Sequence, residues 1–139
     1  MINRYSRPEM TKVWSQKEKY RIWFEIEAYA CEAMEEIGLV PEGTTNNVLR
    51  ASGIEYDIAE IDAIEKITKH DVIAFLTYLS KFIGESSRFV HQGLTSSDVL
   101  DTCFNVQLVN ASNLLEKGLH DLLCAVKERA FEHKDTVCI

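Results

Sequence analysis

A helix-forming segment of great length, at about residues 96–133, restricts the possible folds more than any other feature of the sequence. Apolar residues recur along it in steps of three and four, the spacing of one face of an α-helix. This main stripe comprises Leu100, Phe104, Leu108, Ala111, Leu115, Leu119, Leu122, Val126 and Ala130. The steps come close to an 11-residue repeat, which predicts a nearly straight helix. At 1.5 Å per residue it is about 55–60 Å long, far more than a compact domain of this size needs.

A second apolar stripe widens the apolar arc of the same segment. It comprises Val99, Cys103, Val106, Leu114 and Leu123. One neighbouring helix cannot cover such an arc, so we expect a helical bundle completed by further chain, by other subunits, or by both. The final residues, Thr136-Val137-Cys138-Ile139, have neither a glycine stop nor a polar tail, which indicates a truncated sequence.

Helix-period patterns also dominate the rest of the chain, so we predict an all-α fold. The expected helices cover about residues 9–14, 17–37, 46–51, 57–68 and 71–83. The helix at 17–37 is expected to bury the face formed by Ile22, Ile26, Ala30, Ala33 and Ile37, with Gly38 as its stop. The helix at 71–83 is expected to take Asp71 as its N-cap.

Composition and charge exclude several classes of protein. A net charge of −7 without a Lys/Arg run argues against nucleic-acid binding. No apolar run has the length of a signal peptide or a membrane span. The scattered cysteines are typical of a reducing compartment, and we expect a cytoplasmic protein without disulfides. No histidine or cysteine pair has metal-ligand spacing, so no metal site is expected. The cysteines are Cys31, Cys103, Cys124 and Cys138.

The start of the long segment is the strongest candidate for a binding site. Thr95 and Ser96 place two hydroxyls beside the unpaired N–H groups of a helix start, where a carboxylate or phosphate can bind. The alternative is that Thr95 or Ser96 only caps the helix, with Asp98 completing a capping box. His91 precedes this helix start and His70 precedes the one before it. Both imidazoles suit proton transfer in one cleft, unless each satisfies a local carbonyl group.

Two residues near the N-terminus are further candidates for phosphate binding. Arg4 offers a guanidinium fork and Tyr5 a phenol, although packing on the surface explains both equally well. His120 and His133 lie within the long segment, where we expect partly solvated surface or interface positions.

Separated motifs give the whole chain its resemblance to a known family. They are Arg4-Tyr5-Ser6-Arg7-Pro8-Glu9-Met10, Ile64-Glu65-Lys66 with Lys69-His70-Asp71-Val72-Ile73-Ala74-Phe75, Val90-His91-Gln92-Gly93-Leu94-Thr95-Ser96-Ser97-Asp98-Val99, and Glu132-His133-Lys134. With these motifs the chain resembles the N-terminal part of the adenylosuccinate lyases, in the fumarase/aspartase superfamily. Lys69, Gln92 and Ser97 stand where arginine, tyrosine and threonine are common, and Lys69 lacks the two-pronged guanidinium.

The resemblance implies a cofactor-independent β-elimination on a nucleotide substrate. Adenylosuccinate would give AMP and fumarate, and the succinylated aminoimidazole carboxamide ribotide would give the carboxamide ribotide and fumarate, both in purine biosynthesis. Arg4 and Tyr5 would contact the phosphate, whereas Thr95 and Ser96 would hold the succinyl carboxylates. Lys69, His70 and Asp71 would line the nucleotide and leaving-group side. The catalytic candidates are His70 and His91, the latter orienting substrate or neighbouring groups.

The resemblance also implies an organisation larger than this chain. Residues 1–95 would form an N-terminal helical domain, and residues 96–139 the truncated first long helix of a central bundle. The family assembles as a homotetramer whose active sites combine several subunits. Its histidine acid and serine base lie further along than residue 139, so we expect no activity from this chain alone.

Other interpretations remain open from the residues. Other lyases of the superfamily, acting on argininosuccinate, aspartate or malate, and carboxymuconate-type cycloisomerases share the Thr-Ser helix start. The Arg4-Tyr5 and Lys69-His70-Asp71 motifs favour the nucleotide substrate. A non-catalytic module that binds partner helices through its apolar stripes would also explain the long segment.

Overall fold

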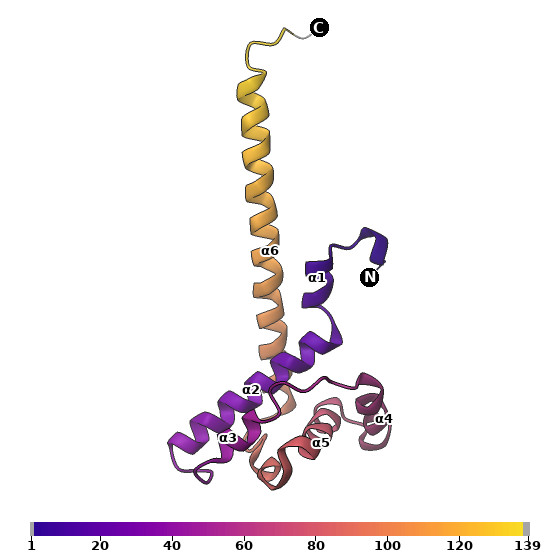
Figure 1. Cartoon of the computed structure of the whole chain (residues 1–139), viewed down its shortest axis with the longest axis vertical. Coiled ribbons are helices and arrows are strands. Elements are labelled where there is room, and N and C mark those ends of the chain that lie inside the picture. The colour runs from indigo at the N-terminus through magenta and orange to yellow at the C-terminus, as the bar shows by residue number, and fades with distance from the viewer. Residues whose placement is uncertain (1, 138–139) are drawn as a thin grey trace.

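The computed structural model describes residues 2–137, and all the regular elements of this part are helical (Figure 1). They are η1 (Asn3–Tyr5), α1 (Pro8–Val13), α2 (Gln16–Glu36), α3 (Thr44–Leu49), α4 (Ile58–Thr68), α5 (Asp71–Ile83), η2 (Gly84–Phe89) and α6 (Ser96–Glu132). The predicted all-α fold is confirmed, and the predicted helices are found within a few residues of their expected ends. The truncation predicted at Cys138 and Ile139 lies outside the described residues.

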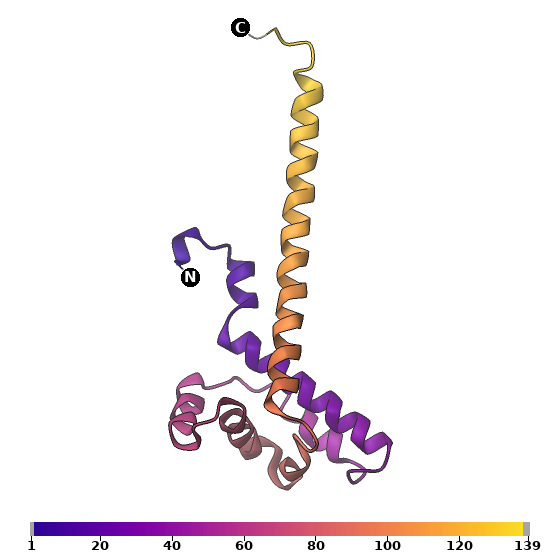
Figure 2. The same ribbon diagram turned by 180° about the vertical axis from the view of Figure 1, so that it is seen from behind.

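The core lies where α2 crosses α5 near the base of α6 (Figures 1 and 2). Trp23 and Phe75 are both fully buried. The Phe75 ring stacks on Tyr20 at a centroid distance of 5.2 Å and meets the edge of Trp23 at 5.5 Å. Aromatic pairs in these arrangements bury large apolar areas and add specific attraction, so this cluster fixes how α2 and α5 cross.

The buried face of α2 differs from the predicted one. Its buried residues are Tyr20, Ile22, Trp23, Phe24, Glu27, Ala28 and Cys31. Of the predicted face only Ile22 is buried, whereas Ala33 is exposed and Ile37 is 71% exposed. Burial of the aromatic side chains on the neighbouring face removes more apolar area from water than burial of the alanines would. The aromatic face of α2 is therefore the one that packs against the core.

Helix α6 leaves the base of the molecule and extends far beyond it. Val99, Cys103, Gln107 and Ala111 are its buried residues, spaced four apart, and they face α2 and α1. Both views show no other described element beside the C-terminal end of α6 (Figures 1 and 2). The main apolar stripe is therefore largely exposed, with Phe104 at 52%, Leu119 at 66% and Val126 at 56%.

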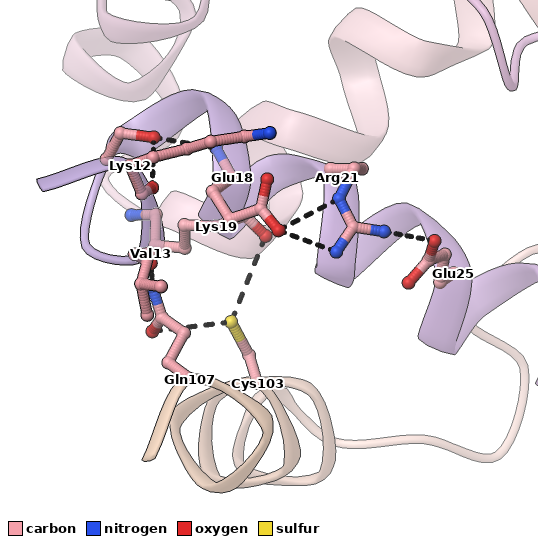
Figure 3. Close-up of polar contacts among 9 residues, drawn as sticks. Lys12, Val13, Glu18, Lys19, Arg21, Glu25, Cys103 and Gln107 are labelled. Carbon is pink, nitrogen blue, oxygen red and sulfur yellow. Dashed lines mark hydrogen bonds and ion pairs between the residues drawn. The ribbon is translucent and has the colours of Figure 1, made fainter. Parts of the chain in front are cut away.

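Polar contacts join α6 to the end of α1 and to the first turn of α2 (Figure 3). The Gln107 side-chain amide donates to the Val13 carbonyl group at 2.8 Å. The Cys103 thiol points to the Lys19 carbonyl group at 3.9 Å. Gln107 thus satisfies a carbonyl group at the end of α1, which sets the height at which α1 lies along α6. No helix within residues 2–137 is both long enough and apolar enough to cross a bilayer.

Candidate functional site

The start of α6 has the predicted capping arrangement. Thr95 is the N-cap, and its backbone N–H donates to Asp98 Oδ2 at 2.8 Å in a capping box. A capping box accounts for two of about four unpaired N–H groups at a helix start. The remaining groups and the half-buried Ser96 stay available to an anion. Capping and anion binding are therefore compatible at this helix start.

His91 lies in the loop before α6 and contacts a buried carboxylate. Its Nδ1 atom is 2.6 Å from Oε1 of Glu27, and the two side chains are 16% and 1% exposed. Burial raises the pKa of the Glu27 carboxyl, and the hydrogen bond with His91 opposes this shift. The His91 backbone has φ of 67°, in the left-handed region. The ring is thus held by an acid on α2 and not by a local carbonyl group.

His70 lies at the start of α5 with Lys69 and Asp71 on either side. It is the N-cap of α5, and its Nδ1 atom accepts from the Ile73 N–H at 3.4 Å. The prediction that Asp71 caps this helix was wrong. Asp71 is the first helical residue, and its Oδ1 atom accepts from the Val72 N–H at 2.8 Å. The preceding Lys69 has φ of 55° and ends α4, which exposes the three side chains at one corner.

Arg4 and Tyr5 lie at a third position, beside the middle of α6. The Arg4 guanidinium is 4.7 Å from the centre of the Tyr5 ring, and Tyr5 is 74% exposed. Tyr5 lines an apolar groove of about 460 Å³ between the N-terminal segment and α6. The groove is lined by Ile2, Tyr5, Ser6, Arg7, Glu9, Met10, Leu114 and Leu115.

Within one chain these groups do not form one site. No hydrogen bond or ion pair joins His70 to His91 among residues 2–137, since His70 accepts from the Ile73 N–H and His91 contacts Glu27, and their common cleft stays a prediction. Leu114, beside Tyr5, lies about 28 Å along α6 from Thr95 at 1.5 Å per residue. Only His91, Thr95 and Ser96 share one loop and helix start.

The two buried cysteines are inert, and the described residues hold no cluster of metal ligands. Cys31 and Cys103 are buried free thiols, and burial raises the pKa of Cys31 to about 11, which keeps it protonated and unreactive. Among residues 2–137, no three His, Cys, Asp or Glu side chains are arranged to hold a metal ion. His120 and His133 are exposed, which agrees with the prediction that they occupy surface or interface positions.

Glu27 is the site residue that the sequence reasoning missed. The signal was present, because Glu27 continues the three- and four-residue spacing of Tyr20, Trp23 and Phe24 on the buried face of α2. An ionisable residue in that position needs a partner in the fold. The face predicted to be buried on α2 did not include Glu27.

Comparisons with known proteins find relatives along the whole chain. A family model described as Lyase matches residues 3–139. The chain is 44% identical over 137 residues to adenylosuccinate lyase of Bacillus subtilis (strain 168), covering 99% of this chain and 31% of that protein. It is 42% identical over 137 residues to adenylosuccinate lyase of Streptococcus mutans, with the same coverages. The chain thus spans about a third of the length of these relatives.

Solved structures share the arrangement of the helices. A 3-carboxy-cis,cis-muconate lactonizing enzyme from Pseudomonas putida matches with a TM-score of 0.86 and 28% identity, over 95% of this chain and 31% of that one. A fumarate lyase from Mesorhizobium sp. BNC1 has the same fold, with a TM-score of 0.85 and 21% identity over 95% of this chain and 32% of that one. Since the family model extends over residues 3–139, the chain belongs to the lyase family.

Proposed function

We propose that this chain contributes the N-terminal part of an enzyme that cleaves adenylosuccinate to AMP and fumarate. The same site would cleave the succinylated aminoimidazole carboxamide ribotide in purine biosynthesis. The observation that supports this most is the 44% identity over 137 residues to a protein named adenylosuccinate lyase. The polar side chains of the motifs shared with that family are exposed at His70 and at Thr95. We place the reaction in the cytoplasm, in line with the buried free thiols.

The proposed chemistry is a β-elimination without a cofactor. A base removes a proton next to a carboxylate, the C–N bond breaks as the C=C bond of fumarate forms, and an acid protonates the departing nitrogen. Thr95 and Ser96 would hold the succinyl carboxylates at the start of α6, where the helix dipole favours negative charge. His70 and Lys69 would lie on the leaving-group side with Asp71.

A complete site would need more than one copy of the chain. The N-terminal pair and the Thr95 helix start lie about 28 Å apart along α6 within one copy. The exposed apolar stripe of α6 supports the assembly that would bring them together, since a bundle of long helices from several copies buries such stripes. We therefore propose a homotetramer, and no activity from this chain alone.

A chimeric enzyme tests the proposed function. This chain replaces the matching third of the Bacillus subtilis protein, and fumarate release from adenylosuccinate is followed by absorbance. We expect activity from the chimera and none from the isolated chain. His70→Asn keeps a good N-cap while removing the imidazole. It is expected to lower kcat by about 100-fold or more, the usual contribution of an acid–base group.

The matched control is His120→Asn, at an exposed position of α6 outside the proposed site. The proposal fails if His70→Asn leaves kcat unchanged, as expected of a module that only binds partner helices. It also fails if the isolated chain releases fumarate. Preference of the chimera for argininosuccinate, aspartate, malate or a carboxymuconate lactone would favour the alternative members of the superfamily.

A further inference from the structure

Glu27 is an acid in the centre of the apolar face of α2. Its side chain is 1% exposed and lies on the same buried face as Trp23 and Ala28. A carboxyl group in such a position loses its hydration, and it is tolerated only when another polar group compensates. The compensation comes from a loop 64 residues further along the chain. Glu27 therefore links the core to the loop before α6.

The link joins Glu27 Oε1 to His91 Nδ1 at 2.6 Å, and the His91 backbone also lowers the pKa of the Glu27 carboxyl through a hydrogen bond. The other carboxylate oxygen, Oε2, is buried and has no hydrogen-bond partner among residues 2–137. His91 adopts φ of 67°, a conformation that few residues other than glycine take unless their surroundings require it. Backbone and side chain of His91 are thus both constrained, a few residues ahead of Thr95.

The contact decides which ring nitrogen of His91 can meet a ligand. An ionised carboxylate has only acceptor atoms, so Nδ1 must carry the proton that lies between the two groups. Nε2 is then the nitrogen that remains, and within the described residues it makes no hydrogen bond. In a neutral ring with this tautomer, Nε2 is an acceptor.

We propose that Glu27 is a positioning residue, which holds the His91 ring with Nδ1 inward and presents Nε2 toward the ligand at the Thr95 helix start. The effect of this positioning on catalysis rests on the lyase function proposed above, whereas the orientation and the tautomer of the His91 ring do not. The buried acid thereby gives His91 one orientation and one tautomer before substrate arrives, and this preorganisation lowers the cost of reaching the reactive geometry.

The first test is nitrogen NMR of the histidine rings in the 139-residue chain. We expect His91 to show a protonated Nδ1 and an unprotonated Nε2 at slightly alkaline pH. In Glu27→Met, whose side chain has similar volume and cannot accept this hydrogen bond, both nitrogens are expected to shift toward the average of the two tautomers. An unprotonated Nδ1 in the unsubstituted chain, or unchanged shifts in Glu27→Met, would overturn the proposal.

The second test is kinetic, in the Bacillus chimera. Glu27→Met is expected to lower kcat by about 10- to 100-fold with little change in KM, the range observed when the carboxylate behind a metal-binding histidine is removed. Glu27→Gln, which still accepts from Nδ1, should recover part of the loss. The control is Glu35→Gln on the same helix, which we expect to leave kcat unchanged.

Circular dichroism of each variant shows whether it is folded. If Glu27→Met does not fold, the kcat of Glu27→Gln tests the proposal instead. A kcat within twofold of the unsubstituted chimera in the folded Glu27 variants would overturn the proposal. An inactive unsubstituted chimera would instead refute the proposed function, and the ring NMR would still decide whether Glu27 fixes His91.

Discussion

At the scale of single residues, left-handed backbone conformations occur at residues of the candidate site. Lys69 and His91 are the two non-glycine residues with positive φ among residues 2–137. Each belongs to a motif on which the resemblance to the adenylosuccinate lyases rests. Left-handed backbone at such residues costs free energy and is concentrated where function requires a particular orientation. The type of residue in each motif was evident from the sequence, but its backbone conformation was not.

The Glu35 carboxylate is expected to make the stability of the fold depend on pH in the acid range. Its carboxylate accepts from the Gly43 and Thr45 N–H groups at 2.7 and 2.6 Å, which lowers the pKa of Glu35 below the ordinary 4.5. Because the folded-state pKa is the lower one, this carboxylate stabilises the fold above about pH 4.5 and loses its effect as the pH falls through the lowered pKa. Glu35→Gln should therefore flatten the fall of the thermal unfolding midpoint between about pH 5 and pH 3.

Circular dichroism melting across this range measures the effect. Glu36→Gln is the control, since its side chain lies next along α2 and is exposed. Midpoints of Glu35→Gln that fall with pH as steeply as those of the unsubstituted chain would contradict the assignment.

At the scale of elements, apolar periodicity located the helices, but side-chain size decided which face each one buries. In α5 both criteria agree, and Val72, Phe75, Leu79 and Ile83 are buried as their spacing suggests. In α2 they disagree, and the aromatic face is the one that packs. In α6, Val99 and Cys103 of the second stripe and Ala111 of the main stripe face the core, whereas most residues of both stripes are at least partly exposed. The predicted boundary at residues 95 and 96 stays a prediction.

Two phenylalanines on α5 test the packing. Phe75 is fully buried and Phe82 is 45% exposed. We expect Phe75→Ala to lower the free energy of unfolding by about 3–5 kcal/mol, because it removes a buried ring and leaves a cavity. Phe82→Ala should cost only about 1 kcal/mol, in proportion to the smaller area that it buries. Urea unfolding followed by circular dichroism gives both values, and equal losses would contradict the description of the core.

At the scale of the whole molecule, the protruding half of α6 is the largest unpaired feature. Leu119, Leu122 and Leu123 are each 58–66% exposed on the part of α6 that extends beyond the other described elements (Figures 1 and 2). Contiguous apolar surface of this kind marks an interaction site. The net charge of −7 does not prevent assembly, because apolar burial acts over short range and surface charge is screened by salt.

Substitutions on this stripe test the assembly. We expect the unsubstituted chain to sediment as an oligomer and the double variant Leu119→Asp, Leu122→Asp to sediment as a 15.9 kDa monomer, since a bundle core excludes unpaired carboxylates. Lys117→Asp changes the net charge by the same amount at an exposed polar position and should leave the oligomer intact. Sedimentation of the unsubstituted chain as a monomer would contradict the proposed bundle.

The sequence by itself determined the helical class, the length of α6 and the family motifs, because periodicity and residue type are local properties of the chain. Tertiary structure alone decided which face of α2 is buried and that Glu27 reaches the loop of His91. Those relations depend on which face of each helix is buried. The buried face is set by the summed packing of side chains that are distant in sequence, such as Tyr20 and Phe75.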